Sequence, residues 1–471
     1  MNSDQQKTPS NTESTKCVIS KYFLFLVISF FYLPFSCIAA QYDVVVVSGG
    51  VAGLSAAKAL MEQQKKVLVL EASNRVGGRV WTKQVKGVPV ELGAAWLHGV
   101  NDNPLSNLVK QHRWQLIKNH YHYSDYTQLM NSMALYDSHG KQLSDKQVEH
   151  LQKQVMQFED FAKAHAPDKP LLQAFHQYCA AKSLSLSEQV QLRYILDVLY
   201  TYEFAANLSD VSLNSDAPYE QDSANGINAL WKQGFQQVVN DLAIGVSVNY
   251  GQIVTSIDYS KQPIKIHTSQ SNYLADAVVV AVPLGILKAE KIQFTPKLPN
   301  AKRQAIQALQ MGLYNKIYLF FDKAFWDKES EWLLQIPNKP SKAITVFNLY
   351  KYLNKPVLVM FTSGKLAQKI EKLDDKKTEL WALQQLKAMY PNETMQLKDS
   401  VITRWGQSKF VLGSYSYLPA HVSPDAIKQL SLPVAGRLFF AGEATSMHAP
   451  STVHGAYTSG LRAAEQVLRN L

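Results

Sequence analysis

The sequence predicts an α/β fold in which a doubly wound sheet is assembled from separated segments of the chain, with an α+β domain inserted between them. A strand–helix–strand pattern opens the globular part at Tyr42–Leu70. Strand patterns return over residues 222–300 and at Arg437–Ala441, whereas residues 110–220 carry mainly helical spacing. Continuous apolar strands that alternate with helices are typical of parallel sheets covered on both faces.

The first strand–helix–strand unit contains a glycine-rich turn. Tyr42–Val47 is a short apolar, β-branched run, and Val67–Leu70 is a second one. Between them, Ala52–Gln64 carries apolar residues at helical spacing, and the turn has the sequence Ser48-Gly49-Gly50-Val51-Ala52-Gly53. This order predicts a Rossmann-like unit that binds a dinucleotide, because the N-terminus of the helix offers free N–H groups and a positive dipole end to phosphates.

The residues of this unit have separate predicted roles. Gly50 lets the backbone approach a pyrophosphate, and Gly53 lets the helix pack close to the strand. Glu71 stands at the end of the second strand, where an acid bonds a ribose hydroxyl. Ser48 occupies the first glycine position, where a positive φ would cost it about 1 kcal/mol. We therefore expect Gly49 to adopt the special dihedral.

A second glycine pair follows Glu71 in the run Arg75-Val76-Gly77-Gly78-Arg79. Two glycines between two arginines let the chain pass close to a flavin nucleotide, while Arg79 reaches its phosphates or the edge of its ring. The pattern from Glu71 to Arg79 resembles that of FAD-dependent amine oxidases rather than that of nicotinamide dehydrogenases. The alternative for both arginines is a solvated turn.

Composition bounds the class of protein. The chain has 471 residues, of which 46% are hydrophobic, so it is long enough for two or three globular domains. Its 48 Lys and Arg against 38 Asp and Glu give a net charge of +10. The excess is diffuse and no nucleic-acid motif accompanies it, so we exclude nucleic acid as a partner. Only Cys179 lies in the body of the chain, and no cysteine–histidine cluster predicts a metal site.

The N-terminus contains an apolar segment. Tyr22–Phe35 is strongly apolar, Lys16 and Lys21 precede it, and Cys37-Ile38-Ala39-Ala40 ends it in small residues. The pattern favours a secretory signal peptide. The alternatives are an uncleaved membrane anchor over residues 22–40 and a lipid-modified Cys37. We therefore expect an exported protein, periplasmic or secreted, or one that is anchored to a membrane.

The rest of the chain divides into segments by their patterns. Helical spacing at Val148, Leu151, Val155 and Phe158 is typical of the region before residue 221. Further strands are predicted at Val246–Tyr250, Ile253–Ile257, Ile264–His267, Asp276–Val282, Asn315–Phe321 and Val357–Phe361, and a last helix from about Thr452. We assign the first, second and third nucleotide-binding segments to residues 41–110, 222–300 and 397–471, and the substrate domain to residues 111–221 and 301–396.

From about Tyr42 to Leu471 the chain resembles the flavin monoamine oxidase superfamily, and within it most closely the polyamine oxidases and the flavin-type lysine demethylases. Several ordered motifs carry the resemblance. They are Glu91–Gly99 with Asn103-Pro104, Pro283-Leu284-Gly285, Asn315-Lys316-Ile317, Arg404-Trp405, Gly413–Tyr417, Ala441–Thr445 and Thr452–Gly460. The resemblance implies an FAD-binding Rossmann-like domain with an inserted α+β substrate domain.

The resemblance also implies which residues hold FAD. Thr452 and Val453 open a helix whose N-terminus faces the flavin C2=O, which stabilises the anionic reduced flavin. Glu443 bonds ribityl hydroxyls, and Val254 lies in a strand that binds adenine through backbone atoms. The full set is Gly49, Gly50, Gly53, Glu71, Ala72, Arg75, Gly78, Arg79, Gly93, Ala94, Ala95, Trp96, Val254, Trp405, Gly442, Glu443, Thr452 and Val453. The segment before Tyr415 lacks the attachment cysteine of monoamine oxidases, so we expect noncovalent FAD.

Four residues are implied to be catalytic. Lys316, which is costly to bury in an apolar strand, matches the family lysine that bonds a water at flavin N5. Trp405 and Tyr415 match aromatic walls of the substrate channel, and His98 matches a histidine near the amine. Ala449 stands where the family carries a second aromatic residue, so we expect a wider cavity unless His448 or Tyr457 substitutes.

These observations predict an FAD-dependent amine oxidase. An amine is oxidised to an imine, which water hydrolyses to an aldehyde or ketone, and O2 is reduced to hydrogen peroxide. Two rival functions stay open. An L-amino-acid oxidase requires a buried arginine for the substrate carboxylate, for which Arg404 is a weak candidate. A flavin-binding protein with little turnover is the other rival, because Ser48 and Ala449 depart from the family pattern.

Overall fold

A computed structural model describes residues 41–122, 126–339 and 344–471 of the chain. These residues belong to one unit, Ala39–Leu471. The predicted signal peptide or anchor falls within residues 1–40, which lie outside the described ranges, so export stays a prediction. Within those ranges, no helix is both long enough and apolar enough to cross a membrane.

An eight-stranded sheet forms the first layer of the fold, and it is drawn from three separated parts of the chain. Its order is β13-β10-β11-β12-β1-β2-β9, and β21 pairs with the second half of β12. The strands are β1 (Gln41–Val47), β2 (Val67–Leu70), β9 (Val248–Asn249), β10 (Val254–Asp258), β11 (Ile264–Thr268), β12 (Asn272–Val280), β13 (Gln293–Thr295) and β21 (Leu438–Phe440). The central strands β2, β1, β12 and β21 are parallel.

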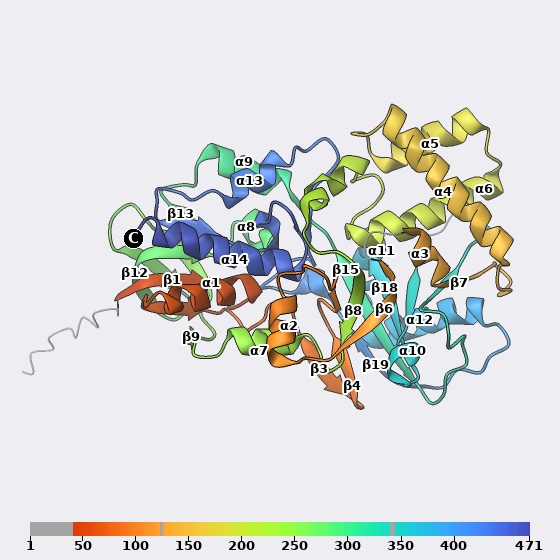
Figure 1. The fold of residues 1–471 in the computed structure, drawn as a ribbon, viewed down its shortest axis with the longest axis horizontal. Coiled ribbons are helices and arrows are strands. Elements are labelled where there is room, and N and C mark those ends of the chain that lie inside the picture. The colour runs from red at the N-terminus through yellow and green to blue at the C-terminus, as the bar shows by residue number, and fades with distance from the viewer. Residues whose placement is uncertain (1–40, 123–125, 340–343) are drawn as a thin grey trace, which may run out of the picture. The chain divides into compact units, whose positions relative to one another are not determined.

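Helices cover both faces of this sheet, which makes it doubly wound. Alternation along β1 sends Val44 and Val46 into a core with α1 (Val51–Glu62) and α14 (Val453–Leu468). It sends Val45 and Val47 to the opposite face, where α9 (Asn300–Ala308) and α13 (Asp425–Ser431) pack. Figure 1 shows α1 and α14 side by side. The predicted fold class is therefore confirmed.

The turn between β1 and α1 differs from the prediction at one residue. Ser48 itself adopts the positive φ, at 102°, and Gly49 does not, so the expectation that Gly49 would take this conformation is wrong. The reason is close packing: the Ser48 carbonyl lies where a Cβ on Gly53 would be, at 1.9 Å. The Ser48 N–H also donates to Leu70 O at 2.9 Å, which fixes the orientation of the peptide.

Ser48→Gly is therefore expected to stabilise the protein. Relief of the left-handed strain is worth about 1 kcal/mol, although the greater freedom of glycine in the unfolded chain offsets part of this gain. Thermal unfolding of the FAD-free protein measures the effect. A melting temperature for Ser48→Gly below that of the wild type would show that Ser48 is not strained.

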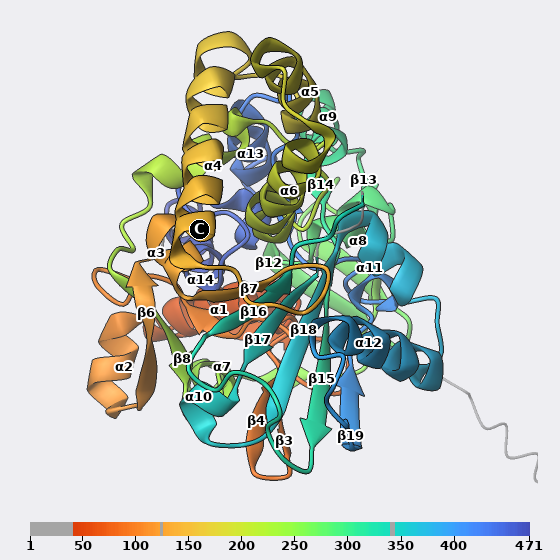
Figure 2. The ribbon, with the colours of Figure 1, turned by 90° about the vertical axis from the view of Figure 1, so that its right-hand side faces the viewer.

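A six-stranded sheet forms the second layer. Its order is β19-β15-β18-β17-β16-β7, and its strands are β7 (Met133–Tyr136), β15 (Tyr314–Phe321), β16 (Trp332–Gln335), β17 (Thr345–Asn348), β18 (Val357–Ser363) and β19 (Leu397–Ile402). Odd-numbered residues of β15 pack against α11 (Gly364–Ile370) and α12 (Asp375–Met389), which lie along one face in Figure 2. The even-numbered Tyr318 and Phe320 face the other way, toward β4 (Val88–Glu91) and β8 (Ile227–Trp231). Lys316 belongs to this second set by its position in the strand.

The remaining elements connect the two layers. A three-stranded sheet has the order β5-β8-β6, from β5 (Trp96–Leu97) and β6 (Leu116–His122), and β3 (Thr82–Val85) pairs with β4. Three long helices, α4 (Asp145–His165), α5 (Leu171–Lys182) and α6 (Leu186–Leu196), pack together at the top of Figure 2. The short elements are α2 (Ser106–His112), α3 (Tyr126–Asn131), α7 (Gln236–Leu242), α8 (Leu284–Lys288), α10 (Tyr350–Leu353), β14 (Gln310–Met311) and β20 (Ser416–Tyr417).

One assignment is confirmed and one needs correction. Residues 110–220 are mostly helical, as predicted, although β6 and β7 also lie within them, because each finds a partner strand far along the chain. The third nucleotide-binding segment was predicted to begin at residue 397, but β19 pairs with β15 in the six-stranded sheet. The helical spacing around Leu151, Val155 and Phe158 is correct, since all three are buried in α4.

Candidate active site

The N-terminus of α1 has the features of a phosphate site. Its N-cap residue is Gly50, no side chain caps it, and its first turn holds no acid. A Cβ on Gly50 would meet nothing closer than the Ser48 hydroxyl at 3.7 Å, so the backbone is approachable there. Unused N–H groups at the positive end of a helix attract anions.

Glu71 lies beside this turn, 6% exposed. One carboxylate oxygen accepts the Gly49 N–H at 2.7 Å, and the other accepts the Ser73 N–H at 2.9 Å and its hydroxyl at 2.7 Å. The Gln252 N–H donates to the Glu71 carbonyl at 2.9 Å, which brings the segment leading to Val254 next to Ala72. The structure thus brings together the residues predicted at the adenosine end.

Arg75 braces the second glycine turn rather than extending into solvent. Its guanidinium donates to Val76 O at 3.1 Å and Gly78 O at 2.6 Å, and it lies 4.1 Å from the centre of the Trp81 ring. Burial lowers its pKa to about 10, while Glu71 acts in the opposite sense. Gly77 and Gly78 both have positive φ, so the tight turn that Arg75 holds depends on glycine.

Arg79 connects this turn to the C-terminal motif. It donates to a Glu443 carboxylate oxygen at 2.6 Å and to Ser414 O at 3.0 Å. The second Glu443 oxygen accepts the Ser416 hydroxyl at 2.6 Å and the Ser451 N–H at 3.0 Å. Glu443 is buried and Arg79 is partly exposed, so a partly buried ion pair links the Arg79 turn to the C-terminal segments.

Lys316 forms hydrogen bonds to the segment that is predicted to pass the flavin. Its Nζ donates to Glu91 O at 3.0 Å and to Gly93 O at 2.6 Å, and the side chain is 4% exposed. Gly93 must be glycine, because a Cβ there would lie 1.8 Å from Arg79 O. Ala94 follows, and its N–H donates to the same Arg79 carbonyl at 3.0 Å.

Burial moves the pKa values of Lys316 and of its acidic neighbour Glu91 toward neutral pH. Desolvation lowers the pKa of Lys316 to about 8, although the negative charge of Glu91 raises it. Desolvation raises the pKa of Glu91 to about 7, against the hydrogen bonds from the Phe235 N–H and the Thr82 hydroxyl and the charge of Lys316. An amine that titrates near neutral pH beside a cofactor segment suits proton handling.

Trp405 is positioned by the same end of β15. Its backbone N–H donates to the Asn315 side chain at 2.9 Å. The Thr403 N–H donates to Lys316 O at 2.9 Å, and the Lys316 N–H donates to the Thr403 hydroxyl at 2.8 Å. The Trp405 indole N–H donates to Leu92 O at 2.8 Å. Lys316 and Trp405 therefore both hold the carbonyls of residues 91–93, which explains why these two motifs occur together.

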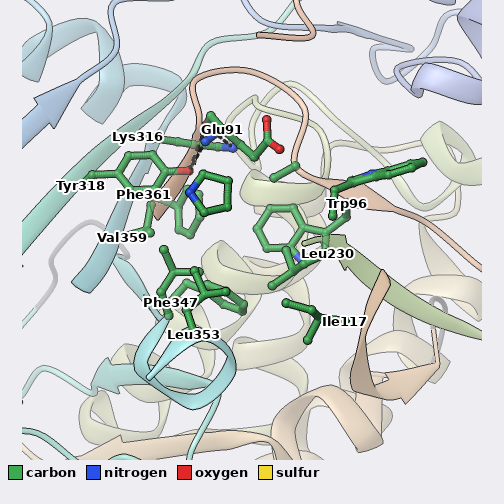
Figure 3. Close-up of a pocket in the computed structure, with 14 residues that line it drawn as sticks. Glu91, Trp96, Ile117, Leu230, Lys316, Tyr318, Phe347, Leu353, Val359 and Phe361 are labelled. Atoms are coloured by element: carbon green, nitrogen blue, oxygen red, sulfur yellow. Dashed lines mark hydrogen bonds between the residues drawn. The ribbon is translucent and has the colours of Figure 1, made fainter. Parts of the chain in front are cut away.

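A cavity adjoins Lys316 (Figure 3). It has a volume of about 30 Å³, counted as the space open to the centre of a water-sized sphere. Lys316 and Glu91 lie on one side, and Val359, Leu230 and Ile117 are among the side chains around the rest. Ala95 and Trp96 from the predicted cofactor set also line it, with the Trp96 ring centre 5.6 Å from Lys316 Nζ.

Tyr415 lies in a second group of residues, which the sequence reasoning missed apart from Tyr415 itself. Its hydroxyl donates to Tyr202 O at 2.7 Å, and its ring centre lies 6.0 Å from that of Tyr314. Burial raises the pKa of Tyr415 far above its ordinary value, and the charge of Glu203 adds to the shift. Burial alone raises the pKa of Glu203 to about 7. The sequence signal for this group was an acid, Glu203, in an otherwise apolar helical run.

His98 belongs to a different group, around the start of α14. Burial lowers its pKa to about 4, helped by His454 and opposed by Asn228 and Asp222, so its imidazole is neutral at pH 7. Thr452 caps α14 by accepting the Gly455 N–H at 2.9 Å, and Val453 begins the helix. His454 and Asp222 form a buried pair at 2.8 Å. The structure thus places His98 beside the helix end predicted to face the flavin.

Residues 51–468 match the family model described as flavin containing amine oxidoreductase. The chain belongs to this family. Polyamine oxidase 2 of Arabidopsis thaliana is 36% identical over 443 residues, which cover 90% of this chain and 87% of the relative. Lysine-specific histone demethylase 1 homolog 1 of Arabidopsis thaliana is 33% identical and is matched over 52% of its own length. These matches confirm that the protein is an FAD-dependent amine oxidase.

The likeness to solved structures concerns the fold. A putrescine oxidase structure with bound putrescine superposes with a TM-score of 0.72 at 19% identity, covering 91% of this chain and 99% of that one. The residues at the start of α1 and the end of β2 in this amine oxidase fit FAD. The open backbone at Gly50 and the uncapped α1 suit phosphates, and Glu71 lies at the end of β2.

Ala449 lies in a closely packed turn of the amine oxidase. It is 4% exposed in the turn before α14, and its carbonyl lies where a Cβ on Gly455 would be, at 1.8 Å. The turn therefore packs against its own helix, and the wider cavity expected at Ala449 stays a prediction. His448 is exposed, and the aromatic neighbour of Tyr415 is Tyr314 instead.

Ala449→Tyr is expected to destabilise the enzyme rather than to change its substrate preference. Inserting a ring at a packed position costs about 1–3 kcal/mol. Urea unfolding measures the loss, and His448→Tyr is the matched control at the adjacent exposed position. Full stability of Ala449→Tyr together with altered kcat/KM for slim amines would restore the cavity interpretation.

Proposed function

We propose that this amine oxidase acts on a cationic aliphatic amine of the polyamine class, with O2 as the electron acceptor and hydrogen peroxide as the product. The observation that carries the proposal is a partly buried carboxyl, that of Glu203, close to tyrosines. Glu203 lies with Tyr219 and Tyr415, since it is a charge neighbour of both hydroxyls. An acid supplies the countercharge for an ammonium group, and aromatic faces attract the same group by cation–π interaction.

The named relatives support the same class of substrate. The chain is 33–36% identical to five plant polyamine oxidases, over 90–92% of its length. A polyamine carries several ammonium groups, so one amine can react while another pairs with Glu203. The aromatic channel group of Tyr202, Tyr314 and Tyr415 then orients the chain of the substrate.

An L-amino-acid oxidase is disfavoured by the arginines of the site. Arg404, the candidate for a substrate carboxylate, pairs with Asp375 at 2.7 Å and donates to Leu373 O at 2.8 Å. Arg79 pairs with Glu443. Both guanidinium groups are therefore engaged by this chain's own acids.

The residues of the chain prepare the substrate in distinct ways. When bound, FAD supplies the acceptor for a hydride from the carbon next to the amine nitrogen. Tyr415 and Tyr314 orient the amine, Glu203 pairs with its distant ammonium, and Lys316 carries a proton at Nζ that it can exchange near neutral pH. The residues that would hold FAD are those at the N-terminus of α1 with Glu71, and the segment 91–96.

A peroxide-coupled screen tests the proposal. Spermine and spermidine are compared with a monoamine such as benzylamine and with L-amino acids, each at several concentrations. We expect peroxide with the polyamines at the highest kcat/KM. Turnover of L-amino acids alone, or amine oxidation without peroxide, would contradict the proposed substrate or the proposed acceptor respectively.

Noncovalent FAD is a separate prediction. The purified protein is expected to be yellow, and acid precipitation is expected to leave its flavin in the supernatant. Glu71→Ala removes the acceptor that holds Gly49 and Ser73, each a charge-assisted bond worth about 1.5–3 kcal/mol, so the affinity for FAD should fall at least tenfold. Equilibrium titration of the apoprotein with FAD measures this affinity. Flavin that stays with the precipitated polypeptide would contradict noncovalent binding.

A further inference from the structure

A buried histidine–aspartate pair lies at the start of α14, and the proposed function does not use it. His454 Nε2 lies 2.8 Å from Asp222 Oδ2, and the two side chains are 4% and 5% exposed. Asp222 follows the 3₁₀ helix Leu213–Gln221, and His454 is the second residue of α14. The pair therefore joins the end of the helical substrate-domain segment to the C-terminal segment predicted to bind FAD.

Asn103 contacts the other ring nitrogen of this histidine. Its Nδ2 lies 3.3 Å from His454 Nδ1. Two backbone groups fix which end of the amide faces the ring, because Oδ1 accepts the Leu105 N–H at 2.9 Å and Nδ2 donates to His98 O at 2.8 Å. An amide nitrogen is only a donor, so Nδ1 of His454 is the acceptor.

These two contacts determine the tautomer of His454. Because Nδ1 accepts from Asn103, it carries no proton, and the ring proton is on Nε2. The Nε2–H then donates to the Asp222 carboxylate, whose other oxygen accepts the Ala224 N–H at 3.0 Å. A doubly protonated ring would bring an Nδ1–H against the Asn103 amide hydrogens. The ring is therefore neutral, and its bonds at both nitrogens give it one orientation.

The chain of hydrogen bonds reaches both groups of the site. At one end, the Asp222 N–H donates to Tyr219 O at 2.9 Å, and Tyr219 lies with Glu203 in the group proposed to bind the amine. At the other end, Asn103 bonds the carbonyl of His98, which is predicted to lie near the amine. Fully satisfied buried networks make the segments that they join rigid. One continuous chain of bonds thus links Tyr219 to His98 and to the first turn of α14.

We propose that Asp222 is a positioning residue for amine oxidation: by fixing the tautomer of His454, it holds His98 and the first turn of α14 in line with the amine-binding group. This role rests on the proposed function. Asp222 acts through His454 and Asn103. A displacement of about 1 Å at a reaction centre can lower the rate about 100-fold, so loosening the chain should affect the rate of amine oxidation more than the binding of the amine.

Nitrogen-15 NMR of the holoenzyme with labelled histidine tests the tautomer without any substrate. At pH 7, His454 should show a protonated Nε2 and an unprotonated Nδ1, and loss of the signal in His454→Gln assigns it. Asn103→Asp replaces the donor to Nδ1 by an acceptor, so the ring should then carry both protons. A wild-type His454 with a proton on Nδ1 would overturn the inference.

Paired variants test the role in catalysis. Asp222→Ala leaves the His454 Nε2–H without its acceptor. It should slow anaerobic flavin reduction by a polyamine about tenfold, with KM changed less than about twofold. His454→Leu should do the same, whereas His454→Gln keeps one donor and one acceptor and should restore most of the rate. His112→Leu is the matched control, because His112 also pairs with a buried acid, Asp241, at 3.0 Å, but lies outside this chain of bonds.

Two kinetic results would also overturn the inference. One is a wild-type rate of flavin reduction in Asp222→Ala. The other is an equal loss of rate in His454→Gln and His454→Leu, because the histidine would then act only by filling space. If His454→Leu does not fold, the comparison of Asp222→Ala with His454→Gln still decides. A wild type that oxidises no amine would refute the proposed function and the catalytic role, and the NMR result would still decide the tautomer.

Discussion

Replacing Lys316 by methionine is expected to slow turnover about 100-fold while FAD stays bound. Methionine keeps the length of the side chain but removes the cation that bonds Glu91 O and Gly93 O. Loss of one preorganised charged group at a reaction centre costs about 10²–10³ in rate. Anaerobic reduction by amine and reoxidation by O2 should be measured separately, and the larger loss is expected in reoxidation.

The pH dependence of reoxidation gives a second test of the role of Lys316. The Lys316 pKa is lowered to about 8 by burial, so its amine is charged below that pH and neutral above it. Reoxidation assisted by the cation should therefore fall as the pH rises through about 8. The reoxidation rate of Lys316→Met should not show this decrease with pH. A wild-type profile that is flat between pH 7 and 9 would contradict a role for the charge.

Lys302 offers a matched control. It is also a buried lysine with a pKa lowered by burial, to about 7, and its Nζ donates to two carbonyls, Gln429 O at 3.1 Å and Leu430 O at 2.7 Å. It stabilises the C-terminal end of α13, outside the site. Lys302→Met should lower stability and leave both half-reactions within about twofold of the wild type. Equal losses of rate in the two variants would mean that Lys316 acts only through folding.

The nucleotide-binding part of the site was the most predictable from sequence. Its chemistry is local: one turn, one helix and the next strand bring Gly50 and Glu71 together, so spacing along the chain carries the information. Ser48 shows the limit of this reasoning. A positive φ was correctly assigned to the turn but to the wrong residue, because the contact that decides it, between Ser48 O and Gly53, exists only in three dimensions.

The substrate side was less predictable because it is assembled from distant segments. Glu203 and Tyr314 come from different segments of the substrate domain, and neither belongs to a spacing motif. Both lie near Tyr415 only in the folded chain. The strands β6 and β7 were missed for the same reason, since their partners are β8 and β16. Local helical spacing cannot reveal pairing of this kind.

Glu203→Gln is expected to lower kcat/KM for a polyamine about 10–100-fold, mainly through KM. The substitution keeps the shape of the side chain and removes the countercharge for an ammonium, a charge-assisted bond worth about 1.5–3 kcal/mol. Burial raises the pKa of Glu203 to about 7 in the free enzyme. Below that pH the carboxyl is protonated and cannot pair, so kcat/KM of the wild type should rise as the pH increases through about 7, and Glu203→Gln should lack this rise.

Glu159→Gln is the matched control, because that carboxylate also contacts a tyrosine, accepting the Tyr200 hydroxyl at 2.6 Å, but it lies in the helical region away from Tyr415. A polyamine KM that is unchanged in Glu203→Gln would show that Glu203 does not pair with an ammonium group of the substrate.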